Sequence, residues 1–151
     1  MATTNVLFVC GDNSATSILA ESILRANGAG RFRAFSAGWQ PAAAVSSEAI
    51  AFLRQRQLPA EGLLPKSFEW FVDPNGPRLD FAILLSDAVP SPAPEWNGAP
   101  VVAHWSIDGE ESLRETFWVL TRRIKIFASL PHGRASRVAL QNRVHSIAVW
   151  Q

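Results

Sequence analysis

Short apolar runs alternate along this chain with longer stretches in which apolar residues recur every three or four positions. The first run, residues 5–10, is almost continuously apolar and ends in the polar residues 11–14. This pattern predicts a buried parallel strand followed by a tight loop. From Ala15, apolar and small residues keep helical spacing until Gly28, which predicts a helix over residues 15–26. Strand, loop and helix in this order form the first half of a βαβ unit.

The same alternation continues in the next segment of the chain. Residues 32–35 alternate weakly between apolar and polar positions and stop at 36–38, which is typical of a second strand. Ser46 or Ser47 can then cap a helix that ends before Pro59. A second strand and a second helix therefore follow the first pair.

Two further strands are predicted in the middle of the chain. Residues 73–78 consist of turn-forming residue types and precede the apolar run 81–85. Four prolines between positions 90 and 100 indicate a long loop, and residues 101–105 form another apolar run. These runs predict the third and fourth strands.

The C-terminal third is predicted to be helical. From Ser112 to Phe127, apolar residues repeat at spacings of three and four, which predicts a long amphipathic helix that Pro131 and Gly133 terminate. Beyond it, residues from about 134 to 150 suggest a helical tail that packs on the body of the protein. Strands that alternate with helices predict an α/β fold, a doubly wound, four-stranded parallel sheet flanked by helices.

Length and composition limit what this fold can do. The chain has 151 residues, 48% of them apolar and 18% charged, which fits one domain over 1–151 with a substantial core. A net charge of +1 gives no electrostatic basis for binding nucleic acid or an anionic membrane. Cys10 is the only cysteine, which excludes an internal disulfide and Cys-rich zinc sites. With no export signal or spanning segment in view, we expect a cytoplasmic protein without metal or cofactor.

The loop after the first strand is the best candidate for chemistry, because ligands of doubly wound sheets bind beyond the carboxyl ends of the strands. Its amides can converge on an anion at the N-terminus of the first helix. The same end of the helix favours the thiolate form of Cys10, and Ser17 can donate a hydrogen bond to the sulfur. Alternatively, Cys10 is only a small apolar residue at the end of a buried strand. The residues expected to surround a phosphate, sulfate or arsenate ion are Gly11, Asp12, Asn13, Ser14, Ala15 and Thr16.

Residues 5–25, with the sequence Phe-Ser-Ala-Gly at 35–38, resemble the low-molecular-weight protein tyrosine phosphatase and arsenate reductase superfamily. The loop of that superfamily is Cys, five residues, Arg, then Ser or Thr, which makes Cys10 the counterpart of the nucleophile. Further segments resemble bacterial arsenate reductase-like members, so the similarity covers almost the whole chain. These segments are residues 66–67, 73–81, 96–100, 103–105, 129–131 and 139–141.

Three positions depart from the pattern that this resemblance implies. Thr16 stands where the superfamily has the arginine that grips the phosphate. Gly109 aligns with the general acid, an aspartate, so Asp108, Glu110 or Glu111 would have to replace it. Thioredoxin-dependent reductases also carry two relay cysteines, which correspond here to Ser86 and approximately to Ala93; neither residue can form a disulfide.

These departures leave three hypotheses about function. The favoured one is a binding protein, a pseudoenzyme that keeps the anion-binding loop, has lost efficient turnover and recognises an oxyanion or a phosphorylated partner. The second is an active arsenate reductase or phosphatase with Cys10 as nucleophile and Ser17 and Asp108 in support. It would need an arginine from elsewhere, such as Arg33 or Arg78. The third is a structural relative whose loop has collapsed. The sequence does not determine the oligomeric state.

Overall fold

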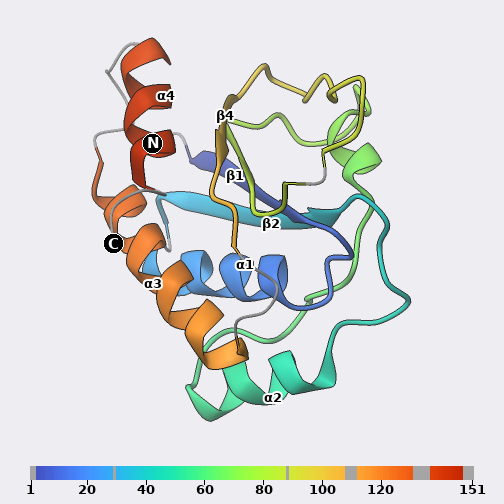
Figure 1. The fold of residues 1–151 in the computed structure, drawn as a ribbon, viewed down its shortest axis with the longest axis vertical. Coiled ribbons are helices and arrows are strands. Elements are labelled where there is room, and N and C mark those ends of the chain that lie inside the picture. The colour runs from blue at the N-terminus through green and yellow to red at the C-terminus, as the bar shows by residue number, and fades with distance from the viewer. Residues whose placement is uncertain (1–2, 29, 88, 108–111, 131–136, 148–151) are drawn as a thin grey trace.

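The structure is a computed structural model that describes residues 3–28, 30–87, 89–107, 112–130 and 137–147 (Figure 1). Four parallel strands form one sheet in the order β2-β1-β3-β4. Their bounds are β1 Thr4–Cys10, β2 Phe32–Gly38, β3 Phe81–Leu84 and β4 Val101–His104. The predicted four-stranded parallel sheet is confirmed, and the second strand extends three residues beyond the predicted 32–35 to Gly38.

The order of the strands determines where a ligand can bind. From β1 the chain passes through a helix to β2 on one side, whereas β3 lies on the other side of β1. Cys10 at the end of β1 is paired with Gly38 at the end of β2, so the two strands finish level with each other. The crevice at such a reversal is the general ligand position of open α/β sheets. The loop after β1 lies at this reversal.

The helices also follow the sequence pattern. They are α1 Thr16–Asn27, α2 Ser47–Gln55, α3 Leu113–Ser129 and α4 Arg137–Ser146, with a short 3₁₀ helix, η1 Phe68–Phe71. Ser46 caps α2, because its side chain accepts a hydrogen bond from the amide of Ala49, and Ser112 caps α3 in the same way. The sequence pattern did not predict η1. Helix α4 falls within the predicted C-terminal tail, while the single domain over 1–151 stays a prediction.

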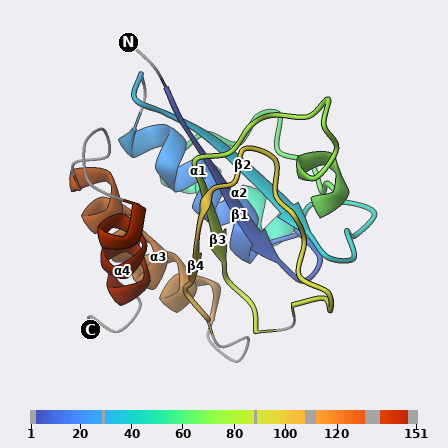
Figure 2. The same cartoon turned by 90° about the horizontal axis from the view of Figure 1, so that it is seen from above.

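Alternate residues of β1 point to two different cores. Val6 and Phe8 are fully buried among side chains of the helices, whereas Leu7 and Val9 are buried against the region of η1 and the loop before β4. Figure 2 shows this division, with α1, α3 and α4 on one side of the strands and the 3₁₀ helix on the other. Burial on both faces explains why β1 is a continuous apolar run. In the part of the chain that the structure describes, no helix is long and apolar enough to span a membrane.

Candidate functional site

The loop between β1 and α1 is held in place by its carbonyl groups. The carbonyl oxygens of Cys10, Gly11, Asp12 and Ser14 accept hydrogen bonds from backbone amides of residues 39–46, over donor–acceptor distances of 2.8–3.2 Å. These four carbonyls therefore point outwards, to the segment that follows β2. The loop is bound by a neighbouring segment of the backbone along most of its length.

The amides of the same loop behave differently. Within the described part of the chain, the N–H groups of Gly11, Asp12, Asn13 and Ala15 have no hydrogen-bond acceptor. The amide of Ser14 donates to Oδ1 of Asp12 at 3.0 Å, and the Ser14 hydroxyl donates to the same oxygen at 2.8 Å. Outward carbonyls and unpaired amides at the start of a helix are the arrangement that binds anions in proteins.

Asn13 fixes the shape of the loop. It is fully buried and adopts a positive φ of 55°, a conformation that asparagine tolerates better than most residues. Its side chain donates to Oγ of Ser17 at 2.8 Å and accepts from the amide of Lys66 at 2.7 Å. Asn13 thereby connects the loop to a segment about fifty residues further along the chain.

The thiol of Cys10 lies at the start of this loop. Its Sγ is 2.8 Å from Oγ of Ser17, and both side chains are buried. Either atom could be the donor. Because Ser17 also accepts a hydrogen bond from Asn13, its own proton is available for the sulfur. The Ser17 hydroxyl is therefore placed to donate a hydrogen bond to Sγ of Cys10.

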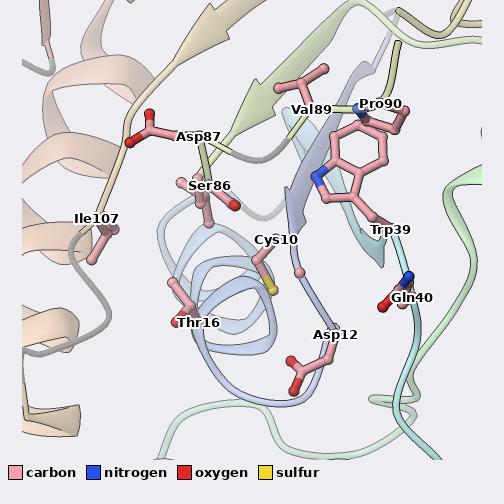
Figure 3. Close-up of a pocket in the computed structure, with 12 residues that line it drawn as sticks. Cys10, Asp12, Thr16, Trp39, Gln40, Ser86, Asp87, Val89, Pro90 and Ile107 are labelled. Carbon is pink, nitrogen blue, oxygen red and sulfur yellow. The ribbon is translucent and has the colours of Figure 1, made fainter. Parts of the chain in front are cut away.

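A cavity of about 860 Å³ opens over the loop. Figure 3 shows Cys10 near its centre, with Thr16 and Ser86 on one side and Trp39 on the other. Its volume is within the range of small-molecule sites. Loop residues, the end of β3 and the segment after β2 all contribute to its wall. The lining residues are Cys10, Gly11, Asp12, Thr16, Trp39, Gln40, Leu85, Ser86, Asp87, Val89, Pro90 and Ile107.

A family model for low molecular weight phosphotyrosine protein phosphatases matches residues 5–90, which include the whole loop, β2, β3 and all of β1 except its first residue. The chain belongs to this phosphatase family. A search of curated protein sequences finds no match. The residues matched contain most of the cavity lining, so the family assignment concerns the site itself.

Solved structures with the same fold include reductases and phosphatases. A thioredoxin-dependent arsenate reductase of Corynebacterium glutamicum superposes with a TM-score of 0.66 and 21% identity, over 82% of this chain and 59% of that protein. An arsenate reductase in its phosphate-binding state gives 0.60 and 22%, over 97% and 98% of the two chains. A low-molecular-weight protein tyrosine phosphatase of T. tengcongensis gives 0.63 and 22%, over 82% and 96%. At these identities the likeness shows the fold alone.

Within this phosphatase-family site, the described lining residues include no lysine or arginine. Thr16, for which the resemblance implies an arginine in the superfamily, lines the cavity. Arg33 pairs in register with Asn5, and the carbonyl of Arg78 accepts a hydrogen bond from the Asn5 side chain. Asn5 and Cys10 are at opposite ends of β1. The expectation that Arg33 or Arg78 reaches the loop is therefore wrong.

Of the other expected site residues that the structure describes, one lines the cavity and one does not. Ser86 lies at the cavity, at the end of β3, whereas Ala93 is exposed and does not line it. Asp108, Gly109, Glu110 and Glu111 lie outside the described residues. Among the residues described, no group of three or more His, Cys, Asp and Glu side chains is arranged to hold a metal ion.

Sequence reasoning did not identify Trp39 and Lys66 as part of the site. Trp39 directly follows the end of β2, and this position beside the end of β1 is the signal that could have identified it. Lys66 holds the loop only through its backbone, so no side-chain pattern indicates its role.

The ammonium group of Lys66 lies 3.8 Å from the buried carboxylate of Glu21, which also pairs with Arg25. Burial lowers the pKa of Lys66, although Glu21 opposes this effect.

Proposed function

We infer that this chain binds a tetrahedral oxyanion, such as phosphate, sulfate or arsenate, in the Cys10–Ser17 loop and turns it over slowly or not at all. One observation supports the loss of turnover: the cavity over the loop has Thr16 on its wall and no guanidinium or ammonium group among its described lining residues. The amides that would bind the anion are present. The charge that would neutralise it during reaction is missing.

The four unpaired loop amides support the binding half of this proposal. They lie at the start of α1, where the helix dipole adds the equivalent of about half a positive charge. The arsenate reductase in its phosphate-binding state has the same fold, which makes phosphate a reasonable first ligand to test. The form of ligand that we propose for a pseudoenzyme of this kind is a larger molecule in the cytoplasm that carries the tetrahedral anionic group as a substituent.

The chemistry of Thr16 supports the loss of turnover. An arginine binds two oxygens of a tetrahedral group at once and balances its charge, whereas a threonine hydroxyl offers one neutral hydrogen bond. Removing one oxyanion donor typically lowers turnover by ~10²–10³-fold, and a transition-state arginine in related chemistry contributes ~10³–10⁵-fold. Even part of this loss reduces catalysis severely.

An active enzyme is the second candidate, and the contact between Cys10 and Ser17 favours it. A thiol held 2.8 Å from a serine hydroxyl at the start of a helix resembles an activated nucleophile. In this case Asp108 would supply the proton to the leaving group. Because Ser86 cannot form a relay disulfide, a reductase of this kind would need an external low-molecular-weight thiol.

A paired assay separates the two candidates. Hydrolysis of p-nitrophenyl phosphate and thiol-coupled reduction of arsenate would be measured for the wild type, Cys10→Ser and Thr16→Arg. We expect weak wild-type turnover and a gain of about tenfold or more in Thr16→Arg, because the guanidinium restores the missing charge. Thr16→Lys is the matched control, since it adds the charge without the bidentate geometry and should gain less.

Two results would contradict the proposal. Robust wild-type turnover that Cys10→Ser abolishes would show an active enzyme. Absence of phosphate, sulfate and arsenate binding by calorimetry, in the wild type and in Thr16→Arg alike, would show that the loop does not bind anions.

A further inference from the structure

The charges around the cavity differ from those expected of a site for a doubly charged anion. Asp12 and Asp87 both line it, and the described lining residues include no cation. Figure 3 shows the two carboxylates on opposite sides of Cys10. Ser106 donates a hydrogen bond to Asp87, and the Ser14 amide and hydroxyl donate to Asp12. These hydrogen bonds hold both carboxylates in place at the wall of the cavity.

The positive charge at the loop is small compared with the two negative charges of Asp12 and Asp87. Unpaired amides and the start of α1 contribute partial charges equivalent to about half an elementary charge. A dianion would bring two negative charges close to two carboxylates, whereas a monoanion would bring one. Because Coulomb repulsion scales with the product of the charges, the dianion meets twice the repulsion from Asp12 and Asp87.

The rest of the wall is suited to an organic group. Trp39, Leu85, Val89, Pro90 and Ile107 provide apolar surface beside the loop. The indole nitrogen of Trp39 is buried and has no hydrogen-bond acceptor in the described part of the chain. Figure 3 shows this nitrogen on the edge of the ring that faces the side of Ser86 and Cys10. A buried donor without an acceptor favours a ligand that presents an oxygen there.

We propose that the cavity selects a singly charged tetrahedral ester with an apolar substituent, such as a sulfate monoester or a phosphate diester, over a doubly charged phosphate monoester. This proposal rests on the proposed function, since the same loop amides bind the anionic group. The presence of Thr16 in place of a cationic residue then changes the preferred charge of the ligand as well as the rate of reaction. Trp39 and its apolar neighbours contact the organic substituent.

Phenyl sulfate and phenyl phosphate test the proposal, because they have similar shapes and differ in charge. At pH 8 the sulfate ester carries one negative charge and the phosphate ester two, since its second pKa is about 6. Calorimetry on the wild type should show phenyl sulfate binding about tenfold more tightly than phenyl phosphate. In Thr16→Arg, the preference should reverse in favour of phenyl phosphate.

A second variant identifies the source of the selectivity. Asp87→Asn keeps the shape and an acceptor for Ser106 but removes one negative charge, so it should improve phenyl phosphate binding about threefold to tenfold and phenyl sulfate binding less. Asp80→Asn is the matched control, because Asp80 accepts a hydrogen bond from the Asn5 amide at the opposite end of β1. This control should leave the ratio of the two affinities unchanged.

The outcomes distinguish this inference from the proposed function. If neither ester binds to the wild type or to Thr16→Arg, the anion-binding function itself is wrong. If phenyl phosphate binds to the wild type as tightly as phenyl sulfate or more tightly, the loop binds anions but the charge selectivity is wrong. A ratio that Asp87→Asn leaves unchanged would also overturn the role given to that carboxylate.

Discussion

Gly38 illustrates how a single residue controls the loop. A Cβ at this position would lie 2.9 Å from the amide nitrogen of Asn13, 2.9 Å from the carbonyl carbon of Asp12 and 3.0 Å from the carbonyl oxygen of Gly11. All three are backbone atoms of the loop, which four carbonyl hydrogen bonds hold in place. A side chain at residue 38 therefore has to move the loop itself.

Substitution of Gly38 tests this contact. We expect Gly38→Ala to lower the free energy of unfolding by about 1–3 kcal/mol, because overpacking against backbone costs that much. Phosphate affinity should fall as well, since the displaced amides no longer converge. Urea denaturation and calorimetry measure the two effects. Gly11→Ala is the control for stability, because its Cβ would meet no atom within 4 Å. Equal stability of the two variants would contradict the argument.

At the scale of elements, α2 depends on one side chain at its start. Ser46 Oγ accepts a hydrogen bond from the amide of Ala49 at 3.2 Å, while Ser47 is the first residue of the helix. The Ser46 amide also donates to the carbonyl of Ser14, so the same residue joins α2 to the loop after β1. This second bond uses the backbone and survives substitution of the side chain.

Two alanine substitutions distinguish the contribution of the capping residue Ser46 to stability from that of its neighbour Ser47. Ser46→Ala should lower the free energy of unfolding by about 1 kcal/mol, because the loss of an N-cap side chain typically costs this amount. Ser47→Ala, inside the helix, should change it by less than about 0.5 kcal/mol, because alanine is a good helix former. Urea denaturation of both variants provides the measurement. A larger loss in Ser47→Ala would show that the cap has been assigned to the wrong serine.

The elements that local pattern could predict are those with a strong period or an apolar run. Strand β1 and helix α3 fall where the sequence predicts them. A strand that is buried on both faces leaves a continuous apolar run, whereas a helix that is buried on one face leaves apolar residues at spacings of three and four. The 3₁₀ helix η1 has no such pattern, because four residues are too short to show a period. The contact between Trp39 and the cavity depends on strand order, which residue patterns do not specify.

At the scale of the whole molecule, Lys66 joins parts of the chain that are distant in sequence. Its amide donates to Asn13 of the loop, its carbonyl accepts from Gly38 at the end of β2, and its ammonium group lies near Glu21 of α1. Glu21 is itself buried and accepts hydrogen bonds from Ser36 and Arg25. The ammonium group therefore pairs with a carboxylate that two other groups already satisfy, and the benefit of its charge is correspondingly small.

This arrangement predicts how stability depends on pH. Burial holds the pKa of Lys66 below its ordinary value of 10.5, so between the two values the unfolded chain binds more protons than the folded one. Stability linked to Lys66 therefore rises as pH increases through this window. Lys66→Met has no titratable group at this position, so its stability lacks this dependence on pH. The free energy of unfolding of the wild type should therefore increase relative to that of the variant between neutral and alkaline pH. Urea denaturation across that range measures the difference.

Lys125→Met on α3 corrects this comparison for effects common to any change from lysine to methionine, because its side chain is exposed. The backbone bonds of residue 66 to Asn13 and Gly38 do not depend on its side chain, so Lys66→Met should keep the loop and bind phosphate as the wild type does. A difference between wild type and Lys66→Met that stays constant with pH would mean that folding does not shift the pKa of Lys66, and one that widens against the wild type at alkaline pH would mean that the charged form is favoured in the fold. In that case the ion pair with Glu21, rather than burial, would determine the protonation of Lys66, and charge would stabilise the contact between the loop and α1.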